Sequence, residues 1–364
     1  MKNQSDQNHF VLSIARRIQI AMVLILLSVI LTLGVLTYQF FAGSPSESMA
    51  KQYVTNYTTK KDIPVPKNEW IAPQVSLIKN EEQRKLAEYG QELIAHTAKY
   101  LGPKGQVAHI SNGLNCQNCH LDAGTKVWGN NYGSVASMYP KFRARSGSVE
   151  NIYKRVNDCF ERSLNGKALD TNSREMQAIY TYITFLGSNV KKGNKAEGSG
   201  FKKVDFLDRA SDPAKGEIVY QQKCQSCHQA DGQGTLKTDG SEYTYPPLWG
   251  PQSYNDGAGL YRITNFAKYV KYNMPLGANA DNPQLSDEEA WDVAAFVNSK
   301  SRPHIPVPND WPDISKKPID HPFGPYADTF SVQQHKFGPW KPIEALQKNA
   351  ENKSAQKITK NTSS

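Results

Sequence analysis

Two copies of the pattern Cys-x-x-Cys-His stand in the chain, as CQNCH at residues 116–120 and as CQSCH at 224–228. Two thiols at this spacing can form thioether bonds to the two vinyl groups of a haem, while the adjacent histidine binds the iron. A zinc site is a poorer interpretation, because zinc ribbons leave about 15 to 20 residues between cysteine pairs and here the pairs are 108 residues apart. The pattern predicts two covalently bound haem c groups, attached through Cys116, Cys119, Cys224 and Cys227, with irons bound by His120 and His228.

Each haem iron has a further axial position, and in the second half of the chain YNMPLG presents Met274 for it. Ligation by a thioether and a histidine raises the reduction potential and suits electron transfer. We therefore expect Met274 to bind the second iron. Lys268 and Lys271 lie nearby and are minor competitors for the oxidised iron.

In the first half the candidates for this position are Met138, Met176 and Cys159, the only cysteine outside the two motifs. An internal repeat favours Cys159. It precedes the closing helix of its half by 13 residues, and Met274 precedes the closing helix of the other half by 12. Met138 remains an alternative, and Met176 falls within the expected helix, where it would fill the core. A thiolate ligand lowers the haem potential, which suits sulfur chemistry better than simple electron transport.

Basic residues surround this cysteine. In the helix expected at 148–164, Arg155, Cys159 and Ser163 are spaced four residues apart and share one face. The preceding segment YPKFRARSG adds Lys141, Arg143 and Arg145. Cations beside a cysteine favour the thiolate and attract a small oxyanion, although an ordinary solvated basic face is the alternative.

Five segments together resemble the periplasmic dihaem c-type thiosulfate dehydrogenases: LNCQNCHLDAG, YPKFRARSG, VNDCFERSLNG, NMPLG and PFGPYADTFSVQQHKFGPW. The resemblance covers about residues 80–342 and implies that two thiosulfate ions are joined to tetrathionate while two electrons leave through the second haem. It also implies that Cys159 is the distal ligand and reactive group of the first haem, and that Arg145 and Arg155 hold substrate. Some members carry a lysine just before the methionine ligand, where this chain has Asn273.

Two other functions remain open at this stage. A SoxA-like thiosulfotransferase also combines a c-type haem with cysteine ligation, but it needs a partner protein that carries the acceptor cysteine. A membrane-tethered dihaem electron carrier without a substrate would use histidine and methionine at both irons, through Met138 in the first half. For the enzyme, we expect the electron acceptor to be another c-type cytochrome or a similar redox protein.

Residues 18–42 carry no charge, and as a helix they would be roughly 37 Å long, enough to cross a hydrocarbon core of about 30 Å. Arg16 and Arg17 precede them, which predicts a cytoplasmic N-terminus and a periplasmic body. A cleaved signal peptide is the alternative, because small residues follow at 42–50. Much of the net charge of +9 lies in the two termini and the body lacks long basic runs, so nucleic-acid binding is not favoured.

The pattern as a whole predicts a mainly α fold with two tandem cytochrome c-type domains. We expect an anchor or signal segment at 1–43, a tether at 44–78, the first domain at 79–187, a linker at 188–211 and the second domain at 212–301. A proline- and aromatic-rich segment at 302–344 would wrap over the body, and 345–364 would be disordered. Helices are expected at 80–101, 148–164 and 172–186, the last capped by Asn172 with Glu175, and later helices start at Pro213 and after Ser286 with Glu289.

Overall fold

The computed structural model describes residues 69–350, together with residues 19, 21–34 and 37. The chain divides into two units, 1–66 and 67–364. In the first unit, residues 21–34 are helical and their apolar side chains are exposed. Among the described residues, no helix combines the length and the apolar character needed to cross a membrane. Most of the predicted anchor and tether, and the tail beyond 350, lie outside the described residues.

Two long helices cross at the centre of the first half of the larger unit: α3 (Glu81–Ala95) and α8 (Arg174–Leu186). They can approach closely because α3 carries Gly90 at the crossing, where an added Cβ would lie 2.1 Å from the carbonyl oxygen of Ala178. The helix expected at 80–101 is divided at His96, after which α4 (Thr97–Leu101) continues. Trp70 packs into the same core, so this body begins earlier than the predicted boundary at 79.

A short hairpin precedes the helix that carries the lone cysteine. Strands β1 (Lys141–Arg143) and β2 (Ser148–Glu150) pair antiparallel, and α7 (Ile152–Arg162) follows. The helix predicted at 148–164 therefore starts four residues late, because residues 148–150 pair with β1 instead. The predicted cap of α8 at Asn172 is also wrong: Ser173 is the N-cap, and its hydroxyl accepts a hydrogen bond from the backbone of Met176.

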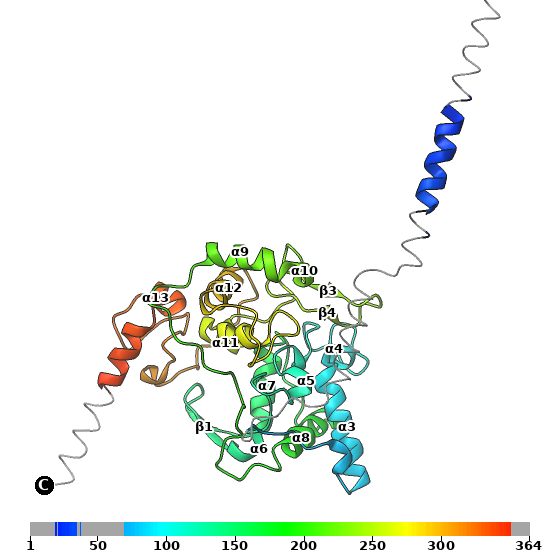
Figure 1. Cartoon of the computed structure of the whole chain (residues 1–364). Coiled ribbons are helices and arrows are strands. Elements are labelled where there is room, and N and C mark those ends of the chain that lie inside the picture. The colour runs from blue at the N-terminus through cyan, green and yellow to red at the C-terminus, as the bar shows by residue number, and fades with distance from the viewer. Residues whose placement is uncertain (1–18, 20, 35–36, 38–68, 351–364) are drawn as a thin grey trace, which may run out of the picture. The chain divides into compact units, whose positions relative to one another are not determined.

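The second half repeats the crossing with α9 (Pro213–Lys223) and α12 (Asp287–Ser299). Gly216 allows this crossing as Gly90 does in the first half, because an added Cβ there would lie 1.9 Å from the carbonyl oxygen of Asp292. The predicted capping box of Ser286 and Glu289 is present. Between these helices lie α10 (Gln225–His228), the strands β3 (Thr235–Leu236) and β4 (Tyr243–Tyr245), and α11 (Ile263–Asn273). Figure 1 shows α9, α11 and α12 grouped together, apart from α3, α7 and α8.

The segment after α12 runs over both halves. Its ordered elements are η4 (Ile314–Lys316) and α13 (Val332–Phe337), and residues 341–350 are helical, so order extends into the predicted tail. Asp320 is buried against Arg262 and Thr264 of the second body, and Trp340 packs on Trp291 of α12 with ring centroids 5.0 Å apart. The mainly α class is found as predicted.

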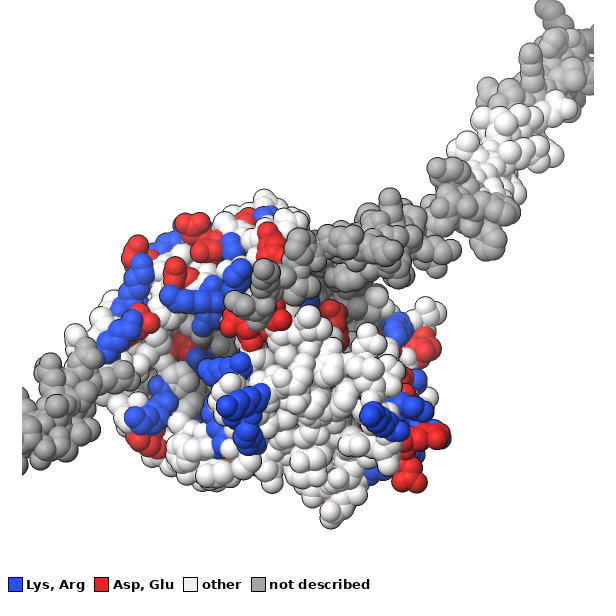
Figure 2. Space-filling model, turned by 60° about the horizontal axis from the view of Figure 1, so that its bottom comes forward, with Lys and Arg blue, Asp and Glu red and all other residues white. Residues whose placement is uncertain are grey.

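Charge on the surface is mixed in sign. Figure 2 shows a broad face of uncharged residues, with lysine, arginine and acidic side chains gathered toward its edges. Basic and acidic side chains both border this face, and the basic ones do not form a continuous stripe across it.

Candidate functional site

The first Cys-x-x-Cys-His segment forms a tight turn, η2 (Cys116–Asn118), followed by the short α5 (Leu121–Gly124). Asn115 and Asn118 cap the turn reciprocally. The backbone N–H of Cys116 donates to the hydroxyl of Thr97 (3.0 Å), and that of Ala98 donates to Asn115 Oδ1 (2.8 Å). The turn is thus held against the start of α4, which fixes where its two thiols point.

His120 is oriented by its backbone surroundings. Its Nδ1 lies 2.6 Å from the carbonyl oxygen of Asn130, which can only accept, so Nδ1 carries the proton. Nε2 is left with a free lone pair, the form of imidazole that binds a metal. The ring of Tyr132 stacks on His120 with centroids 4.5 Å apart and restricts its rotation.

The two thiols and this imidazole line one cavity, which encloses about 990 Å³ of space not filled by atoms, its open mouth included. Its wall is largely apolar, as a porphyrin plane requires, with polar groups confined to a few positions. A covalently attached haem fits the residues present, because both attachment cysteines, a histidine with a bare nitrogen and an apolar wall face the same space. The lining apolar residues are Ile94, Leu114, Tyr132, Val135, Tyr139, Ile152, Val156, Phe160, Leu164, Ile179 and Ile183.

Cys159 faces the same cavity from the last turn of α7, with Arg155 one turn before it and the C-cap Ser163 one turn after it. Arg155 Nη1 donates to the Cys159 sulfur at 3.0 Å. Burial by itself would raise the pKa of this thiol, but the charge of Arg155 and its hydrogen bond oppose this, and the pKa is lowered to about 6. Burial raises the pKa of Cys116 to about 12. The anionic sulfur of this cavity is therefore that of Cys159.

Arg145 lies in a separate cluster. Its Nε donates to Asp310 Oδ2 (2.7 Å) and its Nη2 donates to the carbonyl of Gly257 (2.7 Å). Arg162, at the end of α7, makes a two-pronged pair with the same carboxylate (2.7 and 3.0 Å). Arg145 is not among the residues that line the cavity of Cys159. The structure therefore brings Arg155 and Ser163 to the cysteine and ties Arg145 to the segment after α12.

The second Cys-x-x-Cys-His segment ends α9 and forms α10. Its histidine, His228, donates from Nδ1 to the carbonyl of Pro246 (2.8 Å), so its Nε2 is also free to bind a metal. Met274 caps the C-terminus of α11 and packs against the core of this body. Lys271 is occupied by the carbonyl of Leu285 (2.6 Å) and by the Asp287 carboxylate, which leaves it a weak competitor of Met274.

Two family models match the chain. Residues 106–191 match the SoxA/TsdA cytochrome c domain and residues 213–301 match cytochrome c. The thiosulfate dehydrogenase of Psychrobacter arcticus is 38% identical over 248 residues, which are 66% of this chain and 71% of that protein. The thiosulfate dehydrogenase of Allochromatium vinosum is 40% identical over 60% of this chain and 81% of its own length. The chain belongs to the thiosulfate dehydrogenase family.

A solved structure in this family has a similar fold. The thiosulfate dehydrogenase TsdBA of Marichromatium purpuratum, in its as-isolated form, superposes with a TM-score of 0.60 and 30% identity. The match covers 65% of this chain and half of the length of that one. The predicted family, the oxidoreductase class, the two cytochrome c domains and the haem c cofactors are thereby confirmed.

The other first-half candidates for the distal ligand lie elsewhere in this family member. Met176 is fully buried in the core, as predicted, and Met138 ends α6 (Val135–Met138) and packs beside that core. Neither lines the cavity that holds His120, whereas Cys159 does. The roles of the site residues stay predictions.

The sequence-based prediction missed residues that belong to this thiosulfate dehydrogenase site. The carbonyl of Asn130 orients His120, and Tyr132 stacks on it; both follow the motif within twelve residues, but no pattern in that stretch marks them. Asp310 stands 165 residues from its partner Arg145. A contact at that separation leaves no local signal in one sequence.

Proposed function

We propose that Cys159 is the reactive group with which this chain joins two thiosulfate ions into tetrathionate. One observation carries the proposal. The Cys159 sulfur accepts a hydrogen bond from Arg155 at 3.0 Å, and it faces the same cavity as His120 and the attachment cysteines. A thiolate at this place can bind an iron and can also form a bond to another sulfur.

In the first step the Cys159 thiolate forms a bond to the outer sulfur of one thiosulfate. The product is a cysteine S-thiosulfonate, and two electrons leave the sulfur atoms. No proton is transferred, because both reactants are already anionic. When bound, the haem groups can take up one electron each and pass them on to an external acceptor.

In the second step the outer sulfur of another thiosulfate attacks the outer sulfur of this adduct. The bond between the adduct and Cys159 breaks, tetrathionate departs, and the thiolate is restored. Charge balances, because three negative charges stand on each side. This is the logic of thiol–disulfide exchange, in which an attacking sulfur anion displaces a thiolate from the sulfur that it attacks.

The chain's cations counter the repulsion between these anions. Arg155 already donates to the cysteine sulfur, and its fixed charge stabilises negative charge on either sulfur of the new bond. Ser163 offers a hydroxyl one turn further along the same wall. For Arg145, which does not line this cavity, we propose a supporting role, because Asp310 and the Gly257 carbonyl hold its guanidinium in place.

We infer the location of the protein from its N-terminal sequence. Arg16 and Arg17 before the uncharged residues 18–42 support an orientation in which the body lies in the periplasm, anchored to the inner membrane by this segment. Another c-type cytochrome or a similar redox protein would then collect the electrons from the second haem, held by His228 and Met274.

The test uses haem-loaded protein, thiosulfate and ferricyanide. We expect bleaching of ferricyanide and formation of one tetrathionate for every two ferricyanide ions reduced, without any added protein. A thiosulfotransferase would need a second protein for turnover, and a simple electron carrier would leave both reagents unchanged. Absence of tetrathionate under these conditions would contradict the proposal.

A further inference from the structure

The second body holds the first attachment turn at two points. Glu242, which directly precedes β4, accepts a hydrogen bond from Asn115 Nδ2 (3.0 Å). Tyr269, in α11, donates its hydroxyl hydrogen to the carbonyl of Asn118 (2.7 Å). These two asparagines cap the turn that carries Cys116. The turn is therefore bound from outside its own domain on both of its capping residues.

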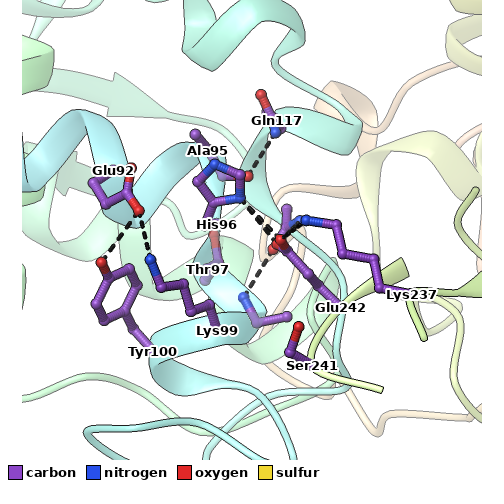
Figure 3. A network of polar contacts seen from close by, with 12 residues as sticks. Glu92, Ala95, His96, Thr97, Lys99, Tyr100, Gln117, Lys237, Ser241 and Glu242 are labelled. Atoms are coloured by element: carbon purple, nitrogen blue, oxygen red, sulfur yellow. Dashed lines mark hydrogen bonds and ion pairs between the residues drawn. The ribbon is translucent and has the colours of Figure 1, made fainter. Parts of the chain in front are cut away.

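Glu242 is a buried carboxylate whose partners come from both bodies, as Figure 3 shows. Only 4% of its side chain is exposed. His96 Nδ1 lies 3.1 Å from each of its oxygens, and Lys237 pairs with it from the neighbouring strand segment. A buried charge with this many partners is costly to move, because any displacement would leave it desolvated and unpaired.

Tyr269 is equally confined. It is buried in the core of the second body, and Phe201 packs edge-on against its ring. Four residues further on, Asn273 Nδ2 donates to the carbonyl of Trp128 in the first body (3.2 Å). The last turn of α11 thus contacts the first body through two side chains.

The same two segments are tied to the expected axial ligands of the second haem. Four residues after Glu242, the carbonyl of Pro246 accepts the hydrogen bond that orients His228. Five residues after Tyr269 comes Met274, the C-cap of α11. Such short segments leave little slack, because each residue spans at most about 3.6 Å and the helix is stiff.

We propose that Glu242 and Tyr269 are positioning residues that hold the two haem sites in one fixed arrangement, because they bind the first attachment turn from segments that also orient His228 and carry Met274. The inference rests on the proposed function in that electrons must pass between the two sites. Transfer of an electron between two sites slows as the distance between them grows, so a shift of either site would lower the rate.

The test measures electron redistribution between the two haems of the full-length, haem-loaded protein. A photoexcited ruthenium complex delivers one electron, and the arrival at the methionine-ligated haem is followed by absorbance. Tyr269→Phe, Glu242→Gln and the double variant are compared with Tyr182→Phe. Tyr182 is a matched control, because it is buried and its hydroxyl donates to the carbonyl of Ala123 (3.0 Å) within the first body.

We expect redistribution to slow several-fold in Tyr269→Phe and in the double variant, with both haems still attached and the near-infrared methionine band retained. Tyr182→Phe should stay within about twofold of the parent. Unchanged redistribution in Tyr269→Phe, or equal slowing in Tyr182→Phe, overturns the inference. This measurement uses no thiosulfate, so it tests the inference independently of the proposed function. If the parent protein failed to oxidise thiosulfate, the proposed function would be refuted, but the redistribution rates would still decide the inference. Should the double variant fold poorly, Tyr269→Phe decides, because it removes a single oxygen.

Discussion

The two halves of this molecule share a scaffold and differ in the residue that we expect to complete each haem site. In each half, two helices cross at a glycine that lies against the backbone of the other helix. This glycine is Gly90 in the first half and Gly216 in the second. In each, the motif histidine donates Nδ1 to a backbone carbonyl and keeps Nε2 free. These shared features present the fifth ligand of an iron in the same way.

The difference lies on the opposite side. Cys159 lies in the last turn of α7, faces a cavity and receives a hydrogen bond from Arg155. Met274 lies at the end of α11, packs against its own core and is neutral. On our proposal, the scaffold would serve electron transfer where a neutral thioether completes the haem site, and sulfur chemistry where an anionic thiolate paired with a cation does.

Removing the thiolate should abolish that difference. We expect Cys159→Gly to lower turnover with thiosulfate by at least about 1,000-fold, as loss of a covalent nucleophile does in other enzymes. Both haems should remain attached, because their four cysteines are untouched. Tetrathionate formation and the haem content per chain are the measurements.

Cys159→Met makes the first site resemble the second and is the companion variant. It should likewise lose turnover while it gains a second methionine–iron absorption band. Turnover close to that of the parent in either variant would show that the reaction does not use this sulfur.

Arg155 sharpens the comparison, because it supplies the charge beside the sulfur. We expect Arg155→Gln to lower turnover by about 100-fold, the usual effect of losing one fixed donor to a developing charge. Arg155→Lys should recover part of the loss, because lysine restores the positive charge but not the planar set of hydrogen-bond donors of a guanidinium group. Steady-state rates with ferricyanide measure both, and equal rates in Gln and Lys variants would argue against an electrostatic role.

The shared crossing predicts equal damage in the two halves. Gly90→Ala and Gly216→Ala should each lower the free energy of unfolding by about 1–3 kcal/mol, because the added Cβ collides with backbone. Gly259→Ala is the control, since a Cβ there would meet no atom within 4 Å. Chemical denaturation measures all three, and a much smaller effect in one half would mean that its crossing is looser.

The link between the halves should weaken in acid. Burial tends to raise the pKa of Glu242, but bonds from Lys237, His96 and Asn115 lower it below 4.5. Because the folded protein lowers the pKa of this carboxyl, the ionised form stabilises the fold. This stabilisation is complete at pH values above the ordinary carboxyl pKa, and it is lost as the pH falls through the pKa of the folded state. We expect Glu242→Gln to remove about 1 kcal/mol of stability at neutral pH and less at pH values below the folded pKa of Glu242. Unfolding curves over this range measure it, and a pH-independent loss would assign the effect to packing.

Local signals in the sequence predicted much of the structure. The cap of α12 at Ser286 and the start of α9 at Pro213 depend on neighbouring residues, and both are found. The stripe of Arg155, Cys159 and Ser163 follows from helical spacing alone, and all three line the cavity.

Distant pairings were beyond the reach of one sequence. Helix α7 starts later in the chain than predicted, because residues 148–150 pair with β1 although their sequence also fits a helix. Glu242 acquires its partners His96 and Asn115 from 127 or more residues away. Buried ion pairs of this kind depend on how the two bodies meet, and residue patterns along the chain do not record that.

The carboxylate of Asp310 has a consequence for the order in which the protein is completed. A chain that emerges N-terminus first exposes both attachment motifs and Arg145 well before Asp310 is synthesised. In such a chain the guanidinium groups of Arg145 and Arg162 still lack this anchor. A product truncated before residue 310 would keep both attachment motifs but would lack the carboxylate that holds both arginines.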